Sequence, residues 1–193
     1  MKPTPGVPRQ LFTASEMSTF CEVDLKTIHN WADRGDIRHF RTPGRHLRFR
    51  RVEALDFLRR YGYPIPEELA AGKPRVHVID EDKASLAAVK RQLSGLYEVE
   101  TFEDGIDALV AIGMEPPDAV VMEAKLSSID AVRAMGRLAR LSATQHVRLI
   151  AYAAHAGPKA KVLELGAAAF VLKPHVDAIS SVLGELLGAI ATT

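Results

Sequence analysis

The sequence predicts a mixed α/β protein in two parts: a small helical head with one β-hairpin, then a doubly wound sheet of five parallel strands. Residues 1–61 carry 12 Lys or Arg against 7 Asp or Glu, whereas residues 62–193 carry 13 against 17. Three prolines and two glycines interrupt residues 62–74, between the two charge regimes. Beyond them, five apolar runs alternate with five helical patterns, which is typical of a parallel sheet covered by helices. We therefore expect domains at 1–61 and 75–193, joined by a linker at 62–74.

The composition is that of a globular protein, with 47% hydrophobic and 25% charged residues among 193. The single cysteine, Cys21, excludes an intramolecular disulfide and a multi-cysteine zinc site, which fits a reducing compartment. The most apolar stretch, 178–190, is interrupted by Glu185, and the N-terminus lacks the apolar core of a signal peptide. We therefore expect a cytoplasmic protein with no membrane contact.

The first two elements of the head are helices with recognisable N-terminal caps. Thr13 and Glu16 have the spacing of a capping box, which predicts a short helix through about Phe20. After a tight turn, Asp24 can cap a second helix, which the pattern extends over 25–33. Two short helices joined by a turn are thus expected at the start of the head.

A hairpin and a closing helix complete the head. Residues 39–41 and 46–50 alternate polar and apolar side chains, and a Pro-Gly pair lies between them in 42–45. Residues 52–61 follow with apolar side chains at helical spacing and with Phe57 at the margin of the apolar face. The pattern therefore predicts a β-hairpin followed by one more helix.

Four segments of the head occur in a recognisable order: Leu11-Phe-Thr-Ala-Ser-Glu16, Val23-Asp-Leu-Lys-Thr-Ile-His-Asn-Trp31, Arg34-Gly35 and Gly44-Arg-His-Leu-Arg-Phe49. In this order and spacing they resemble the excisionase and MerR-type winged helix-turn-helix family. The resemblance implies that the head binds double-stranded DNA and that the hairpin is its wing.

The residues expected to contact DNA lie on the second helix and the hairpin. Helix-turn-helix units present the start of the second helix to the major groove, which would place Lys26, Thr27, His29 and Asn30 near bases or phosphates. Six arginines with no intervening acid follow in 14 residues: Arg38, Arg41, Arg45, Arg48, Arg50 and Arg51. They are typical of a phosphate-binding surface, with Arg45 at a tip that could enter the minor groove. The alternative is a solvated face on a structural or peptide-binding module.

The second part has the pattern of a doubly wound sheet. The expected strands are 76–79, 97–102, 119–122, 149–152 and 168–172. The expected helices are 85–96, 105–113, 129–141, 159–165 and 177–190. In such sheets the functional crevice lies at the carboxyl ends of the strands, so residues that follow the strands are the candidates for a site.

Two motifs lie at those ends: Asp80-Glu81 after the first strand, and Lys173-Pro174 after the last. With the strand and helix order, they resemble a response-regulator receiver domain with a flavodoxin-like sheet, from about Arg75 onward. The resemblance implies an acidic pair that holds a divalent cation, a lysine beside it, and a phosphoacceptor aspartate.

The sequence departs from the receiver pattern at two positions. Glu123 stands at the place of the phosphoacceptor aspartate, and Ala153 at the place of the switch threonine or serine. Glutamate carries one methylene more, so its oxygen would enter the space of the phosphoryl group, and alanine offers no hydroxyl to it. We therefore expect a pseudo-receiver with a degenerate phosphoacceptor site at Asp80, Glu81, Glu123, Ala153 and Lys173.

Three interpretations of this degenerate site stay open. The Glu123 carboxylate could lie near Lys173 and replace phosphoaspartate in a fixed, active-like state. Asp80, Glu81 and Glu123 could instead hold a Mg²⁺ ion, since oxygen ligands suit a hard cation. A structural charge cluster without a cofactor or metal is favoured over the ion. Phe170, at the place of an aromatic switch residue, is expected to pack in the core.

A broad apolar stripe on the last helix could support a dimer: Val182, Leu183, Leu186, Leu187 and Ile190. The sequence as a whole predicts a non-enzymatic, sequence-specific DNA-binding transcriptional regulator, which forms a homodimer or binds a protein partner through its pseudo-receiver. The alternative is a signalling adaptor whose pseudo-receiver docks a protein partner while the head makes non-specific DNA contacts.

Overall fold

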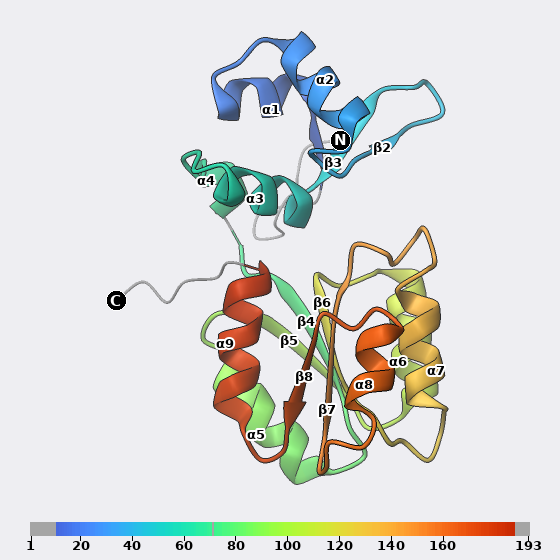
Figure 1. Cartoon of the computed structure of the whole chain (residues 1–193). Coiled ribbons are helices and arrows are strands. Elements are labelled where there is room, and N and C mark those ends of the chain that lie inside the picture. Colours follow the sequence, from blue (N-terminus) through green and yellow to red (C-terminus); the bar gives the residue numbers. More distant parts are fainter. Residues whose placement is uncertain (1–10, 71, 188–193) are drawn as a thin grey trace. The chain divides into compact units, whose positions relative to one another are not determined.

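The structure is a computed structural model that describes residues 11–70 and 72–187, and the chain divides into two compact units between Gly72 and Lys73 (Figure 1). Each unit has its own sheet, and both contain helices, so the α/β prediction is confirmed. Among the described helices, none has the length and apolar character needed to cross a membrane.

The first unit contains a small antiparallel sheet and four helices within the described residues. Its elements are β1 (Leu11–Thr13), α1 (Ala14–Cys21), α2 (Leu25–Arg34), β2 (Phe40–Arg41), β3 (Leu47–Arg50), α3 (Arg51–Arg60) and α4 (Glu67–Ala70). The strand order is β1-β3-β2, with β3 in the centre. The predicted helix-turn-helix and hairpin are therefore present, and β1 adds a third strand that the sequence did not predict.

Local side-chain bonds fix where α1 and α2 begin. Thr13 accepts a hydrogen bond from the Glu16 backbone N at 3.2 Å, and the Glu16 carboxylate accepts one from the Thr13 backbone N at 2.8 Å. Asp24 caps α2 by accepting from the Thr27 backbone N at 2.7 Å. Gly35 ends α2 with a φ of 80°, a left-handed conformation that costs glycine little. Both predicted caps are confirmed.

The sequence predicts a linker at residues 62–74, but most of this segment is part of the first unit. It contains the short helix α4, and Leu69 is completely buried in the core of the first unit. Tyr63 and Ile65 pack against the same core. Apolar side chains between the prolines therefore hold most of this segment on the head. Phe57, expected at a margin, is also buried, at 3% exposure.

The hairpin turn has its left-handed residue one position later than its glycine. The Arg45 backbone N donates to the Thr42 carbonyl at 2.7 Å, which closes the turn between β2 and β3. Arg45 has a φ of 61°, a conformation that is uncommon for residues other than glycine. The turn therefore directs the exposed Arg45 side chain from the tip of the hairpin.

Within the described residues, the second unit is a parallel sheet of five strands with five helices. The strands are β4 (Arg75–Ile79), β5 (Glu98–Phe102), β6 (Ala119–Glu123), β7 (Arg148–Ala153) and β8 (Ala169–Leu172). The helices are α5 (Lys83–Leu93), α6 (Gly105–Met114), α7 (Ala131–Leu138), α8 (Lys159–Glu164) and α9 (Val176–Leu187). Every predicted element of this unit is present, with ends shifted by a few residues. Ile190, which the sequence placed on the last helix, lies outside the described residues.

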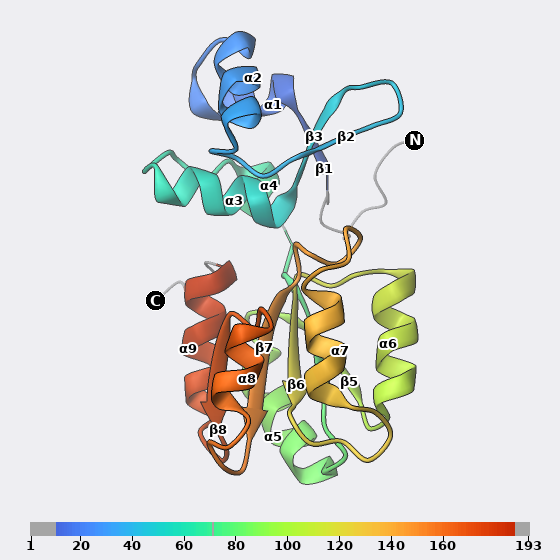
Figure 2. The ribbon, with the colours of Figure 1, turned by 45° about the vertical axis from the view of Figure 1, so that its right-hand side comes forward.

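The sheet order places the functional edge. The strands lie in the order β5-β4-β6-β7-β8 and are all parallel. The chain adds β5 on one side of β4 and then β6, β7 and β8 on the other side, as in a doubly wound fold. Helices α5 and α9 cover one face, and α6, α7 and α8 cover the other (Figure 2). The carboxyl ends of β4, β6, β7 and β8 consequently meet at one edge.

Candidate functional site

The carboxyl edge of the five-stranded sheet brings together the predicted acidic and basic residues. Asp80 follows β4, Glu123 ends β6, and Lys173 follows β8. Lys173 Nζ lies 2.6 Å from Asp80 Oδ2 and also forms an ion pair with Glu123 Oε2. Asp80 is 3% exposed and Glu123 is 8% exposed, so the lysine bridges two buried carboxylates. Glu123 and Lys173 therefore lie together, as one of the three interpretations requires.

Tyr152 completes this cluster, and the sequence did not identify it. Its hydroxyl donates to Asp80 Oδ2 at 2.6 Å, and Lys173 Nζ lies 4.7 Å from the centroid of its ring. Tyr152 lies beside Ala153 near the end of β7 and is buried. A tyrosine in an otherwise aliphatic strand run, Leu149-Ile-Ala-Tyr-Ala153, was the available signal. We call Asp80, Glu123, Tyr152 and Lys173 the lysine-bridged cluster.

The cluster has a consistent electrostatic character. Burial raises the pKa of the Tyr152 hydroxyl, and its hydrogen bond to Asp80 raises that pKa further, so the hydroxyl remains a donor. Burial tends to lower the pKa of Lys173, but its bonds to Asp80 and Glu123 outweigh this, and the net pKa is raised. The lysine is therefore charged, and it neutralises part of the buried negative charge.

Both carboxylate oxygens of Asp80 accept hydrogen bonds from donors of the protein. Oδ2 receives both the Tyr152 hydroxyl and the Lys173 ammonium, while Oδ1 accepts from the Asp82 backbone N at 2.9 Å. Glu123 Oε1 accepts from the Lys125 backbone N at 3.2 Å. Both carboxylates are thus held by protein donors on each of their oxygens.

Glu81 is directed to a different part of the edge. Its Oε1 accepts from the Ser127 backbone N at 2.5 Å, the Ser127 hydroxyl at 2.7 Å and the Ser128 backbone N at 3.2 Å. These bonds lower the pKa of Glu81, first through the Ser127 hydroxyl. Across residues 11–70 and 72–187, no three His, Cys, Asp or Glu side chains are grouped as metal ligands. Glu81 therefore stabilises the loop after β6.

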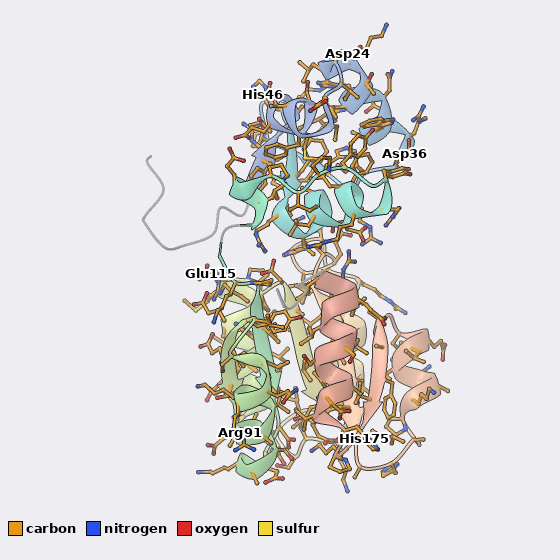
Figure 3. All side chains as sticks on the ribbon, turned by 90° about the vertical axis from the view of Figure 1, so that its left-hand side faces the viewer. Asp24, Asp36, His46, Arg91, Glu115 and His175 are labelled. Atoms are coloured by element: carbon orange, nitrogen blue, oxygen red, sulfur yellow. The ribbon has the colours of Figure 1, made fainter. Side chains whose placement is uncertain are left out.

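The two switch positions also have buried or packed side chains. Ala153 is 3% exposed and brings no hydroxyl to the edge. Phe170 is half-buried and packs against the core between the sheet and α6, α7 and α8. The loop after Lys173 continues through a cis peptide bond to Pro174 and then to His175, which Figure 3 labels.

On the first unit, the predicted DNA-contacting residues of α2 differ in exposure. Lys26 and Asn30 are exposed, one turn apart, near the start of α2, whereas Thr27 and His29 are half-buried. Figure 3 labels Asp24, which caps this helix, and His46, in the hairpin turn. Of the four residues of α2 that the sequence predicts to contact DNA, Lys26 and Asn30 are therefore the two with exposed side chains.

The hairpin arginines fall into different environments. Arg38 and Arg45 are exposed, Arg41 is paired with Asp33 at 2.9 Å, and Arg48 is half-buried with a bond to the Leu47 carbonyl. The Arg50 guanidinium lies 4.9 Å from the centre of the Phe40 ring, and burial lowers its pKa.

Arg51 corrects one sequence expectation. The sequence predicts it among the phosphate-binding arginines, but it begins α3, is 3% exposed, and donates to the Gly72 carbonyl at 3.2 Å. Its role is to hold the end of the first unit, because a buried guanidinium needs internal acceptors. The exposed basic surface is therefore smaller than the charge count suggested.

The apolar stripe of the last helix is mostly used in packing. Leu183 and Leu187 are buried, while Val182 and Leu186 are half-buried at its margin. The predicted dimer surface is thus limited, within the described part of α9, to that half-buried margin.

Comparison with known proteins agrees with both units. Residues 76–183 match the family described as Response regulator receiver domain, and residues 11–61 match that described as Helix-turn-helix domain. Neither description names an enzymatic activity. The chain is 32% identical over 105 residues to the transcriptional regulatory protein PrrA of Mycobacterium tuberculosis, covering 53% of this chain and 45% of PrrA. It is 35% identical over 65 residues to the response regulator MprA of Mycobacterium sp. strain KMS, covering 33% and 28% respectively. The chain thus matches about half the length of PrrA, and less of MprA.

Solved structures share the fold of the second unit. The response regulator DrrB of Thermotoga maritima superposes with a TM-score of 0.55 at 23% identity, over 60% of this chain and 53% of DrrB. The chemotaxis response regulator CheY4 of Vibrio cholerae gives 0.55 at 18% identity, over 60% of this chain and 99% of CheY4. These structures agree with the observed sheet order. The family match over residues 76–183, more than half of the 193 residues, shows that the chain belongs to the response regulator receiver domain family.

Proposed function

We propose that the protein is a sequence-specific DNA-binding transcriptional regulator whose receiver unit works without phosphorylation. The lysine-bridged cluster is the observation that carries the second half of this proposal. A receiver needs a carboxylate that can attack a phosphoryl group in line, with room around it. Here Glu123 is paired with Lys173, and both oxygens accept protein donors.

The missing hydroxyl and the cation site support the same conclusion. Ala153 cannot bind a phosphoryl oxygen, and Glu81 is engaged by Ser127 and Ser128. Asp80 already receives a tyrosine hydroxyl and an ammonium group. A Mg²⁺ ion would have to displace the Lys173 ammonium from Asp80, and this favours the charge cluster over the metal site. The Lys173 ammonium instead neutralises the negative charge that a Mg²⁺ ion would otherwise neutralise.

The Glu123 to Lys173 ion pair also supports the fixed-state interpretation. In this interpretation the extra methylene carries the Glu123 carboxylate to the lysine without a phosphoryl group. The receiver unit would then serve permanently for dimerisation, through the half-buried margin of α9, or for binding a protein partner. No input phosphate is needed in such an arrangement.

The head supplies the DNA-binding half of the proposal. Lys26 and Asn30 are exposed on the second helix of the helix-turn-helix. Arg38 is exposed just before the hairpin, and Arg45 is exposed in its turn. An exposed asparagine on a recognition helix can pair with adenine, and exposed arginines contact phosphates. This division of labour suits a protein that selects a DNA sequence.

Two experiments on the full chain test the proposal. Incubation with acetyl phosphate and Mg²⁺, followed by intact-mass measurement, should add no phosphoryl group, while a conventional receiver treated in parallel is labelled. Selection of fragments from a random DNA pool near physiological salt should enrich one motif, in two spaced copies if the protein dimerises. A labelled protein would refute the phosphorylation-independent receiver. Enrichment of no motif would favour the adaptor alternative.

A further inference from the structure

The helices α7 and α8 form a groove whose charge differs from the rest of the receiver unit. The groove has a volume of about 460 Å³ and is lined by Asp130, Val132, Arg133, Gly136, Arg137, Arg140, Lys161 and Leu165. Figure 2 shows α7 and α8 side by side on the same face of the sheet. Residues 62–193 carry 13 Lys or Arg and 17 Asp or Glu, yet four of the 13 line this one groove.

The arginines are placed to contact one ligand together. Arg133 and Arg137 are one turn apart on α7, where such positions are about 5–6 Å apart. Arg140 follows the end of the helix, and its backbone N donates to the Arg137 carbonyl at 3.1 Å. All three are exposed, and within residues 11–70 and 72–187 none has an acidic side chain within 4.0 Å of its guanidinium. Lys161 reaches the groove from α8 and also pairs with Glu164 at 3.0 Å.

Stabilisation of the helix does not account for this pattern. Arginine near the C-terminus of a helix offsets its dipole, which would explain Arg137 and Arg140. Arg133, however, lies in the first turn of α7, where the dipole favours an acid. A cation placed at the unfavourable end, with no ion-pair partner in the described chain, points to an anion from outside.

The floor of the groove is apolar and closely packed. A Cβ at Gly136 would lie 3.3 Å from the Leu165 Cβ, so α7 and the end of α8 approach as closely as a glycine allows. Val132 and Leu165 give the floor apolar surface. Asp130 caps α7, because its Oδ1 accepts from the Arg133 backbone N at 3.0 Å, and its Oδ2 remains as an acceptor at one end of the groove. Asp130 would repel phosphates, so the phosphate chain runs away from Asp130, from Arg133 towards Arg137 and Arg140.

We propose that this groove binds a nucleoside oligophosphate, with its phosphates on the arginines and its base on the apolar floor. The volume falls in the range of small-molecule sites, and arginine binds phosphate oxygens through two parallel hydrogen bonds. Asp130 can accept from a ribose hydroxyl or a base amino group. The site does not depend on DNA binding by the head, and it would give a receiver that lacks phosphorylation a chemical input.

The first test uses ATP as the probe and the full chain in isothermal titration calorimetry. ATP should bind, inorganic triphosphate should bind more weakly, and adenosine should bind least. The double variant Arg137→Ala, Arg140→Ala should weaken ATP binding by about tenfold or more, because it removes two charge-assisted contacts to the phosphates. The matched double variant Lys90→Ala, Arg91→Ala removes the same charge from exposed positions on α5 and should bind ATP as the natural chain does.

The outcomes separate this site from DNA binding. Absence of ATP binding, or equal weakening by the α5 variant, would overturn the proposal. Equal affinity for ATP and inorganic triphosphate would refute the nucleoside part, since the apolar floor would then contribute nothing. The same α7 variant is also titrated with duplex DNA over a range of salt concentrations. An unchanged salt dependence supports a separate ligand site, whereas a reduced one would show that the groove binds the DNA backbone instead.

Discussion

The Tyr152 hydroxyl donates a 2.6 Å hydrogen bond to Asp80 Oδ2, the same oxygen that Lys173 Nζ meets at 2.6 Å. Two donors from neighbouring strand ends therefore converge on one buried carboxylate oxygen. Tyr152 precedes Ala153, the position at which the sequence lacks a switch hydroxyl. The cluster thus contains a hydroxyl, but it is fixed on Asp80 inside the protein.

Replacing Tyr152 by Phe removes that hydroxyl while keeping the ring beneath Lys173. We expect the free energy of unfolding to fall by about 1–2 kcal/mol, because a buried acceptor loses one of its donors. Urea unfolding followed by circular dichroism measures the change. Tyr61→Phe is the control, since Tyr61 is 53% exposed and its substitution should have almost no effect. Equal stability of the two variants would mean that the Tyr152 hydroxyl contributes nothing to the cluster.

Replacing Lys173 by Met should destabilise the protein more strongly. The change leaves the two carboxylates of Asp80 and Glu123 buried without their shared cation, and breaking a buried ion pair costs about 3–5 kcal/mol. The side chain of Lys173 is 22% exposed, so we expect the lower end of that range, about 3 kcal/mol, in urea unfolding. Lys159→Met, at an exposed position at the start of α8, is the matched control. A loss no greater than the control's would contradict a stabilising role for the bridge.

His77 should make stability depend on pH below neutrality. Burial, and to a lesser extent the charge of Arg75, lower its pKa from 6.5 to about 4, whereas Glu115 opposes the shift. Between pH 6.5 and about 4 the unfolded chain binds a proton that the folded chain does not, so stability falls as the pH falls. Glu100 Oε2, 3.1 Å from Nε2, would favour the charged ring, so the loss should stay below about 3 kcal/mol.

The variant His77→Leu tests this dependence. It replaces the titrating ring on β4 by an apolar side chain of similar size. Urea unfolding at several pH values between about 4 and 7 should show a shallower loss of stability than in the natural chain. Parallel curves for the two proteins would assign the acid sensitivity to other groups.

Helix caps and the residues that meet at the carboxyl edge of the sheet could be predicted from the sequence. The caps at Thr13 and Asp24 depend on side chains three residues from the groups they bind, so spacing alone reveals them. The meeting of Glu123 with Lys173 follows from a general property of parallel sheets, whose carboxyl ends share one edge. The site could therefore be located before its geometry was known.

Features that depend on distant pairing or on burial could not be predicted. Strand β1 has three residues, and it forms because Leu11 to Thr13 pair with β3, far along the chain. Tyr152 looks like a core residue, and its partner Asp80 depends on the strand order. Arg51 is counted as a surface cation by any charge tally, yet its place at the start of α3 buries it. Residue pattern and composition do not reveal these long-range pairings or this burial.

The hairpin arginines should govern the salt dependence of DNA binding more than its sequence preference. Arg45 is exposed at the turn, and Arg48 is half-buried on β3, so both can neutralise phosphate charge. The double variant Arg45→Ala, Arg48→Ala should weaken binding to all sequences. It should also reduce the slope of log affinity against log salt by about two, because each phosphate that an arginine neutralises contributes about one. Fluorescence anisotropy with a selected and a scrambled duplex measures both quantities.

Asn30→Ala should affect sequence preference and not salt dependence, the opposite of the arginine variant, because the Asn30 side chain is expected to contact a base edge. It should reduce the preference for the selected duplex, by about 1–3 kcal/mol of discrimination, and leave the salt slope unchanged. Arg91→Ala, on the exposed surface of α5, is the control for loss of one positive charge outside the head. If the Arg45 and Arg48 variant kept the natural salt slope while losing sequence preference, the hairpin would be reading bases, and the assignment of α2 as the specificity element would be wrong.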